Sequence, residues 1–205
     1  MKMSRTSANL ADAERGGWIT TFTGGRFLPL HPIACDVDIR DIAHALAMKC
    51  RYSGHCRSFY SVAEHSVRVR SRLEVGGWDR RVQLAGLLHD AAEAYLVDMP
   101  RPVKYAPEMN GYRKLEDAVQ ATIYTRFGLP TLEYPCVKEA DEAVLELEMR
   151  HLMPPQAGKF FYAARGLAWD GPNADCDFIT LLPDAAEKLF LLTFNSIRLE
   201  TEVPS

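Results

Sequence analysis

The sequence lacks any hydrophobic run long enough to cross a membrane. Apolar stretches such as residues 181–182 and 189–192 fall far short of the roughly 20 residues that a membrane-spanning helix needs. Residues 1–15 also lack the apolar centre of a secretory signal. We therefore expect a soluble protein with no membrane partner.

Cysteine is scarce, and positive charge is not in excess. The five cysteines are odd in number and irregular in spacing, unlike the disulfide framework of a secreted domain, so a cytoplasmic protein with structural cysteines is expected. Cys50 and Cys56 do not have the spacing of a zinc finger. The 24 Lys and Arg against 27 Asp and Glu give a net charge of −3, which argues against nucleic acid as the main partner.

The glycine-rich signatures of several enzyme classes are missing too. There is no Walker loop, no G-x-S-x-G turn and no G-x-G-x-x-G motif, which weakens the P-loop, α/β-hydrolase and dinucleotide-binding interpretations. The remaining composition is that of an ordinary globular chain, and 205 residues fit one domain. We expect residues 1–16 to be disordered and residues 17–205 to form a single domain.

Helical periodicity dominates the pattern of apolar residues. Residues 18–30 read as a small hairpin around Gly24-Gly25. After it, Asp38 and Ser61 are predicted helix N-caps, the second in a capping box with Glu64. The predicted helices cover residues 38–49, 61 onward, 79–96, 111–127, 137–151 and 183–200, whereas residues 153–180 show no clear period. The fold class is therefore all-α, a helical bundle with a small N-terminal β-hairpin.

Four residues of metal-ligand type fall on the apolar faces of three of these helices. His89 and Asp90 interrupt a strongly apolar stretch, and a buried unpaired carboxylate is costly unless a cation accompanies it. His65 and Asp141 lie beside the buried positions of two other helices. Considered alone, His65 is equally well explained as a buried core histidine, and Asp141 as part of a salt bridge. Together they favour an N/O metal site that suits Zn, Mn, Fe, Co or Mg.

Further polar residues near these positions suit an anionic substrate. Glu93 follows His89 by one helical turn, where a carboxylate can exchange a proton with water or a leaving group, unless it only faces solvent. Asp98 can bind a sugar hydroxyl or cap a turn. Arg51 and Lys104 can bind phosphate, unless they are only exposed surface charges, and Tyr52 or Tyr105 can stack on a base. Two more cations lie in the same segments, Arg57 and Arg101.

The order His65, His89-Asp90, Asp141 resembles the HD-domain metal-dependent phosphohydrolase superfamily. The segments that carry the resemblance are residues 60–67, 88–105 and 137–141, within a matching region of residues 38–151. They are similar to bacterial 5′-deoxynucleotidases and to phage dATP triphosphohydrolases. The resemblance implies an HD-domain fold and a homo-oligomer, a dimer or a hexamer. It also implies a divalent metal (Zn, Co, Mn or Mg) held by His65, His89, Asp90 and Asp141.

The same resemblance assigns roles to the other polar residues. Glu93 would be the catalytic carboxylate and Asp98 would contact the sugar. Lys104 would bind phosphate, and Arg51 and Tyr52 would correspond to the substrate-binding arginine and aromatic residue of the family.

The expected activity is hydrolysis of a deoxynucleotide. Residues 92–96 are closer to the phage enzymes, which favours dATP triphosphohydrolysis over release of phosphate from a deoxynucleoside monophosphate. A phosphodiesterase for cyclic or signalling nucleotides and a non-catalytic nucleotide-binding module are the alternatives.

Overall fold

The N-terminal hairpin is present as expected. The computed structural model describes residues 17–171 and 178–199, so the predicted disorder of residues 1–16 lies outside the described part. Strand β1 (Ile19–Thr20) pairs antiparallel with β2 (Arg26–Phe27). Gly24 has a φ of 83° in the connecting turn, a conformation that glycine adopts without strain. Thr23 donates its backbone N–H to Asp41 over 2.7 Å, which fixes the hairpin to the first helix.

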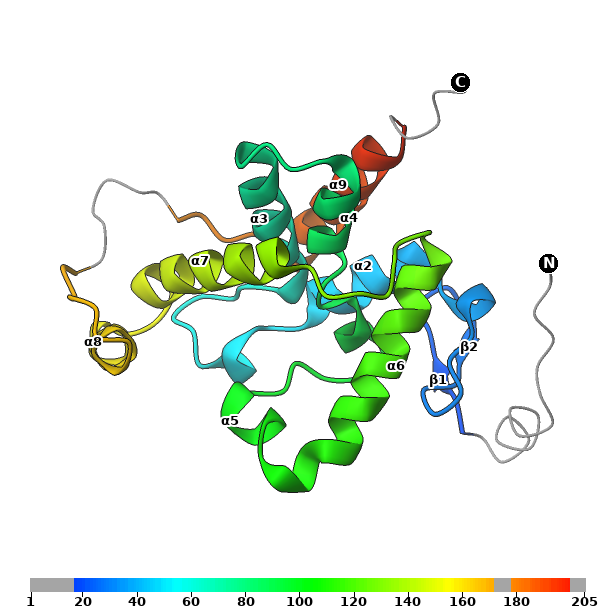
Figure 1. Ribbon diagram of the computed structural model, residues 1–205, viewed down its shortest axis with the longest axis horizontal. Coiled ribbons are helices and arrows are strands. Elements are labelled where there is room, and N and C mark those ends of the chain that lie inside the picture. The colour runs from blue at the N-terminus through cyan, green and yellow to red at the C-terminus, as the bar shows by residue number, and fades with distance from the viewer. Residues whose placement is uncertain (1–16, 172–177, 200–205) are drawn as a thin grey trace.

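Helices form most of the rest of the described chain (Figure 1), which confirms the all-α class with a small hairpin. The longer ones are α2 (Ile39–Met48), α3 (Val62–Val75), α4 (Arg80–Leu87), α6 (Asn110–Arg126), α7 (Pro135–His151), α8 (Pro155–Ala164) and α9 (Pro183–Leu199). Shorter turns are η1 (Ala34–Asp36), η2 (Tyr52–Gly54), η3 (Ala91–Ala94), α5 (Arg101–Lys104) and η4 (Pro107–Met109). Within the described residues, no helix is long and apolar enough to cross a membrane.

Both predicted N-caps are confirmed, but the capping box is only half formed. The Asp38 side chain accepts the N–H of Arg40 at the start of α2. Ser61 Oγ accepts the N–H of Glu64 at the start of α3. The Glu64 carboxylate does not complete a capping box; it turns away and accepts the N–H of Leu181 over 2.9 Å. Glu64 thereby joins α3 to the segment that leads into α9.

Helix α3 lies at the centre of the packing. It contacts α4, α7 and α9, and α9 also packs along α2. The cluster of buried residues runs from Phe27 in the hairpin to Ile197 in α9, and it includes Phe190 and Phe194, which are almost fully buried. The helix after residue 180 therefore shares the core of residues 38–151, the region of the family resemblance.

The single helix predicted for residues 79–96 is wrong. Helix α4 ends at Leu87, a turn carries His89 and Asp90, and the shorter helix η3 follows. The side chain of Gln120 on α6 stabilises the break, because it donates to the carbonyl of Leu88 over 2.7 Å and accepts the N–H of Ala92 over 3.0 Å. The N–H of Ala92 therefore needs no helical partner, and the carbonyl of Leu88 accepts a second hydrogen bond besides that from the N–H of Ala91.

The region without a clear period contains a helix that the sequence did not reveal. Helix α8 begins at Pro155, a residue favoured in the first helical turn. It packs against the C-terminal end of α7 (Figure 1). Glu200, the predicted end of the last helix, lies outside the described residues.

Candidate metal centre

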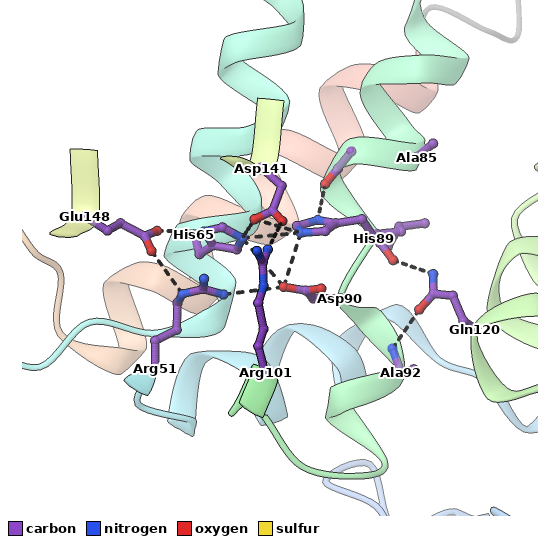
Figure 2. Close-up of polar contacts among 12 residues, drawn as sticks. Arg51, His65, Ala85, His89, Asp90, Ala92, Arg101, Gln120, Asp141 and Glu148 are labelled. Atoms are coloured by element: carbon purple, nitrogen blue, oxygen red, sulfur yellow. Dashed lines mark hydrogen bonds and ion pairs between the residues drawn. The ribbon is translucent and has the colours of Figure 1, made fainter. Parts of the chain in front are cut away.

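Two imidazole rings face each other where α3 meets the turn after α4. His65 lies in the first turn of α3 and is fully buried. Its Nε2 atom is 3.3 Å from Nε2 of His89 (Figure 2). Two nitrogens that bind one ion at about 2.1 Å with tetrahedral geometry lie about 3.4 Å apart. The two histidines therefore have the spacing of ligands to one metal ion.

The other ring nitrogen of each histidine is already bonded. His89 Nδ1 lies 2.8 Å from the carbonyl of Gly86, which can only accept, so this nitrogen carries the proton. His65 Nδ1 donates in the same way to the carboxylate of Glu148 over 2.7 Å. In a neutral imidazole this arrangement leaves the lone pair on Nε2. Such contacts orient histidine ligands in metal sites.

Two carboxylates complete the cluster. Asp141 Oδ1 on α7 lies 3.1 Å from His65 Nε2, and ligand atoms of His65, His89 and Asp141 all lie within 4.8 Å of one another. This group could hold a metal ion. Asp90 Oδ2 lies 3.2 Å from His89 Nε2 and 3.6 Å from His65 Nε2. All four predicted ligands are thus neighbours, although Asp90 lies on a turn instead of the predicted helix.

The charges at this centre are strongly coupled. Burial raises the pKa of Asp90 and Asp141, but the neighbouring histidines outweigh it and hold both below the usual range. Burial and Arg51 lower the pKa of His65, yet Glu148 and Asp141 outweigh them and raise it to about 9. The centre therefore stabilises positive charge between its carboxylates. A metal ion that takes Nε2 of His65 must displace a proton there.

Glu148 is the functional residue that the sequence analysis missed. Its carboxylate is fully buried on α7, where it accepts from His65 and from the hydroxyl of Tyr52. Its Oε2 also pairs with Nε of Arg51 over 3.3 Å. Glu148 lies two helical turns after Asp141, on the same face of α7, and that spacing is the signal that could have identified it.

The remaining predicted site residues share one cavity beside the cluster. The cavity has a volume of about 730 Å³, within the range of small-molecule sites. Every predicted catalytic and substrate-binding residue contributes to its wall, together with two of the predicted metal ligands: Arg51, Tyr52, Asp90, Glu93, Asp98, Lys104 and Asp141.

Glu93 has the environment of a protonated carboxyl group. It lies on η3 with only 6% of its surface exposed, and its Oε2 has no hydrogen-bond partner among the described residues. Burial, reinforced by Asp90 and Asp98, raises its pKa well above the usual range. Lys49 donates to the backbone carbonyls of Glu93 and Leu96 and so fixes the segment. A carboxyl group of this kind can donate a proton inside the cavity.

The cations of the cavity all have carboxylate partners. Lys104 Nζ lies 2.6 Å from Glu116, and Arg51 pairs with both Glu148 and Asp90. Arg101 Nη2 lies 2.9 Å from Asp141 and also pairs with Glu142, which in turn binds Arg165 over 3.2 Å. Arg57, the remaining cation that the sequence suggested for an anionic substrate, instead donates to the carbonyl of His151.

Comparison with known proteins gives relatives of undetermined function. No family model matches the chain. An uncharacterized protein of Rhodobacter capsulatus is 41% identical over 130 residues, which are 62% of this chain and 66% of that protein. The uncharacterized protein YfdR of Escherichia coli is 33% identical over 181 residues, which are 88% of this chain and 95% of YfdR. With a match over nearly the full length of both proteins, the chain belongs to the same family as YfdR.

Proposed function

We propose that this chain is a metal-dependent phosphohydrolase of the HD-domain superfamily that acts on deoxynucleotides. The observation that carries the proposal is the pair of imidazoles with Nε2 atoms 3.3 Å apart, both fixed at Nδ1 and flanked by carboxylates, beside a cavity that contains cations. An N/O ligand set of this kind suits Zn, Co, Mn or Mg. A divalent ion bound there would supply Lewis acidity toward phosphate and water.

The residues of the cavity have complementary roles in this reaction. Arg51 and Lys104 bind the phosphate oxygens, and Asp98 accepts a hydrogen bond from a sugar hydroxyl. The oxygen of water bonds to the α-phosphorus while the bond from that phosphorus to the 5′ oxygen breaks. Glu93, with its raised pKa, donates a proton to the 5′ oxygen as it leaves. The attacking water gives up one proton, which restores the protonated form of Glu93, and the products are a deoxynucleoside and a phosphate or triphosphate anion.

The number of cations favours a deoxynucleoside triphosphate, and we propose dATP. Among the described residues, four positively charged side chains line the cavity, Arg51, Arg101, Lys104 and Arg165. The β- and γ-phosphates add about two negative charges that need such partners. One observation favours a monophosphate instead, namely that each of these four cations is already paired with a carboxylate. Monophosphate hydrolysis is therefore the second candidate.

Analysis of the products of dATP and dAMP tests this proposal. The metal-loaded chain is incubated with each nucleotide, and the released anions are separated. We expect inorganic triphosphate and deoxyadenosine from dATP. Orthophosphate from dAMP alone would establish the second candidate, and stepwise formation of dADP or no turnover of either nucleotide would contradict both.

Two variants provide the matched comparison for this assay. Glu93→Gln removes the proposed proton donor and should lower the rate at least a hundredfold. Glu139→Gln changes an exposed carboxylate on α7 and should leave the rate unchanged.

A further inference from the structure

Two thiols lie side by side at the two ends of a turn whose residues Arg51, Tyr52 and His55 line the cavity. Sγ of Cys50 is 3.5 Å from Sγ of Cys56, and both residues are partly buried. An antiparallel β-bridge between the backbones of Cys50 and Ser61 fixes Cys50 beside the start of α3. The intervening turn, η2, brings the second cysteine back to the first. The two sulfurs need to approach by only about 1.5 Å to reach bonding distance, about 2.05 Å.

The turn between the cysteines has an unusual backbone. Tyr52 and Ser53 have φ values of 57° and 51°, in the left-handed region that residues other than glycine rarely adopt. Residues other than glycine are strained in this conformation and keep it only where their surroundings hold them in place. A covalent bond that closes this loop therefore acts on a segment with stored strain.

The same loop carries two side chains that contact the metal centre. Arg51 pairs with Glu148 and Asp90, and the hydroxyl of Tyr52 donates to Glu148. Glu148 in turn accepts from the buried His65. A shift of the loop is thus transmitted to a proposed metal ligand through one carboxylate.

We propose that Cys50 and Cys56 form a reversible disulfide, in exchange with a small-molecule disulfide such as oxidised glutathione, and that this bond displaces Arg51 and Tyr52 from Glu148. The effect of this disulfide on turnover rests on the proposed phosphohydrolase function. The site would then respond to the thiol–disulfide balance of its surroundings.

The exchange balances in two steps. The Cys50 thiolate attacks one sulfur of oxidised glutathione, which forms a mixed disulfide and releases one glutathione thiolate. Cys56 then loses its proton to solvent and attacks the sulfur of Cys50, which releases the second glutathione. Two cysteine thiols are oxidised and one glutathione disulfide is reduced to two thiols.

The environment of Cys56 suits the second of these two steps. Burial raises the pKa of its thiol to about 11, and the adjacent Cys50 contributes to the rise. Cys56 is therefore the weaker initial nucleophile and the one that resolves the mixed disulfide.

Peptide mapping tests the bond independently of any activity. The full chain is treated with oxidised glutathione, its remaining thiols are alkylated, and it is digested with trypsin without reduction. Because trypsin cuts after Arg51, the disulfide should join the dipeptide 50–51 to the peptide 52–57. This species should vanish with dithiothreitol and in Cys50→Ser or Cys56→Ser, and persist in the controls Cys35→Ser and Cys136→Ser. Mixed glutathione adducts alone would overturn the proposal.

Arginine modification tests the displacement. The side chain of Arg51 is 12% exposed in the paired state, so phenylglyoxal should modify it at least tenfold faster after oxidation. Arg40, whose side chain is 64% exposed, should react at the same rate in both states. Equal reactivity of Arg51 in the two states would refute the displacement even if the disulfide forms.

Turnover measurements separate this inference from the proposed function. Oxidation should lower the hydrolysis of dATP at least tenfold in the unmodified chain, reversibly with dithiothreitol, and leave Cys50→Ser unaffected. A chain that forms the mapped disulfide but hydrolyses no nucleotide in either state contradicts the phosphohydrolase proposal and leaves the disulfide established. If the chain hydrolyses dATP at the same rate before and after oxidation, the disulfide does not control turnover.

Discussion

Glu148 is the side chain on which the order of the metal centre depends most. Its carboxylate orients His65, pairs with Arg51 and accepts a hydrogen bond from Tyr52. Glu148 itself is fully buried. Burial acts to raise the pKa of Glu148, but Arg51 and His65 outweigh it and lower the pKa to about 2. The carboxylate is therefore charged at neutral pH, and its charge is matched by its partners.

Replacement of this carboxylate should weaken metal binding. In Glu148→Gln the amide oxygen can still accept from His65, but the negative charge that balances Arg51 is lost. We expect the affinity for a divalent metal to fall about 10–100-fold, as for other residues that orient metal ligands. Competition with a fluorescent chelator measures the change, with Glu139→Gln as the exposed control on the same helix. Equal affinities of the two variants would show that Glu148 is only structural.

Glu93 should make the stability of the metal-free chain depend on pH. Its pKa is raised in the folded state from an ordinary value of 4.5, so folding favours the protonated form. This contribution is fully present below about pH 4.5 and is lost as the pH rises toward the folded pKa. The loss approaches about 1.4 kcal/mol for each unit by which the pKa is raised.

Glu93→Gln stays neutral at every pH and therefore tests this dependence. Urea unfolding of the metal-free protein at about pH 5 and about pH 8 should show that the stability of the variant relative to the unmodified chain is greater at the higher pH. A difference that is the same at both values would mean that Glu93 is ionised in the folded chain.

At the scale of elements, the break between α4 and η3 determines the position of His89 and Asp90. Gln120 satisfies two backbone groups across this break. Gln120→Ala leaves both without that partner and should lower the free energy of unfolding by about 1–3 kcal/mol. Gln156→Ala, at an exposed position of α8, should change it by less than about 0.5 kcal/mol. Urea denaturation of both variants checks this, and equal effects would exclude the bridging role.

The same break shows which elements local sequence signals can predict. Asp38 and Ser61 specify helix starts because each bonds to backbone two or three residues away. The end of α4 has no such local signal, since the apolar pattern continues through Ala91 and Ala92 and the stabilising residue, Gln120, comes from a distant helix. Helix α8 was missed for a related reason, because it buries only Gly158 and Tyr162, and both lie against a loop tryptophan, Trp169.

At the scale of the whole molecule, the candidate metal ligands were more predictable than the residues that support them. His65, His89 and Asp141 were identified because their chemistry is unusual on apolar helix faces, and the fold brings them together. Their supporting contacts come from residues far away in the sequence, such as Glu148 on α7. Helix periodicity shows which face is buried, but it does not show which buried groups meet across the core.

The metal content of the purified chain shows whether His65, His89, Asp90 and Asp141 bind a divalent metal. Elemental analysis after exhaustive dialysis should find a divalent metal in stoichiometric amount. His89→Ala and Asp141→Asn should retain less than about a tenth of it, whereas His55→Ala, at an exposed position of a nearby loop, should retain all of it. A folded, unmodified chain that retains no metal after loading with Zn, Co, Mn or Mg, or a His89→Ala variant that retains it fully, would contradict the account.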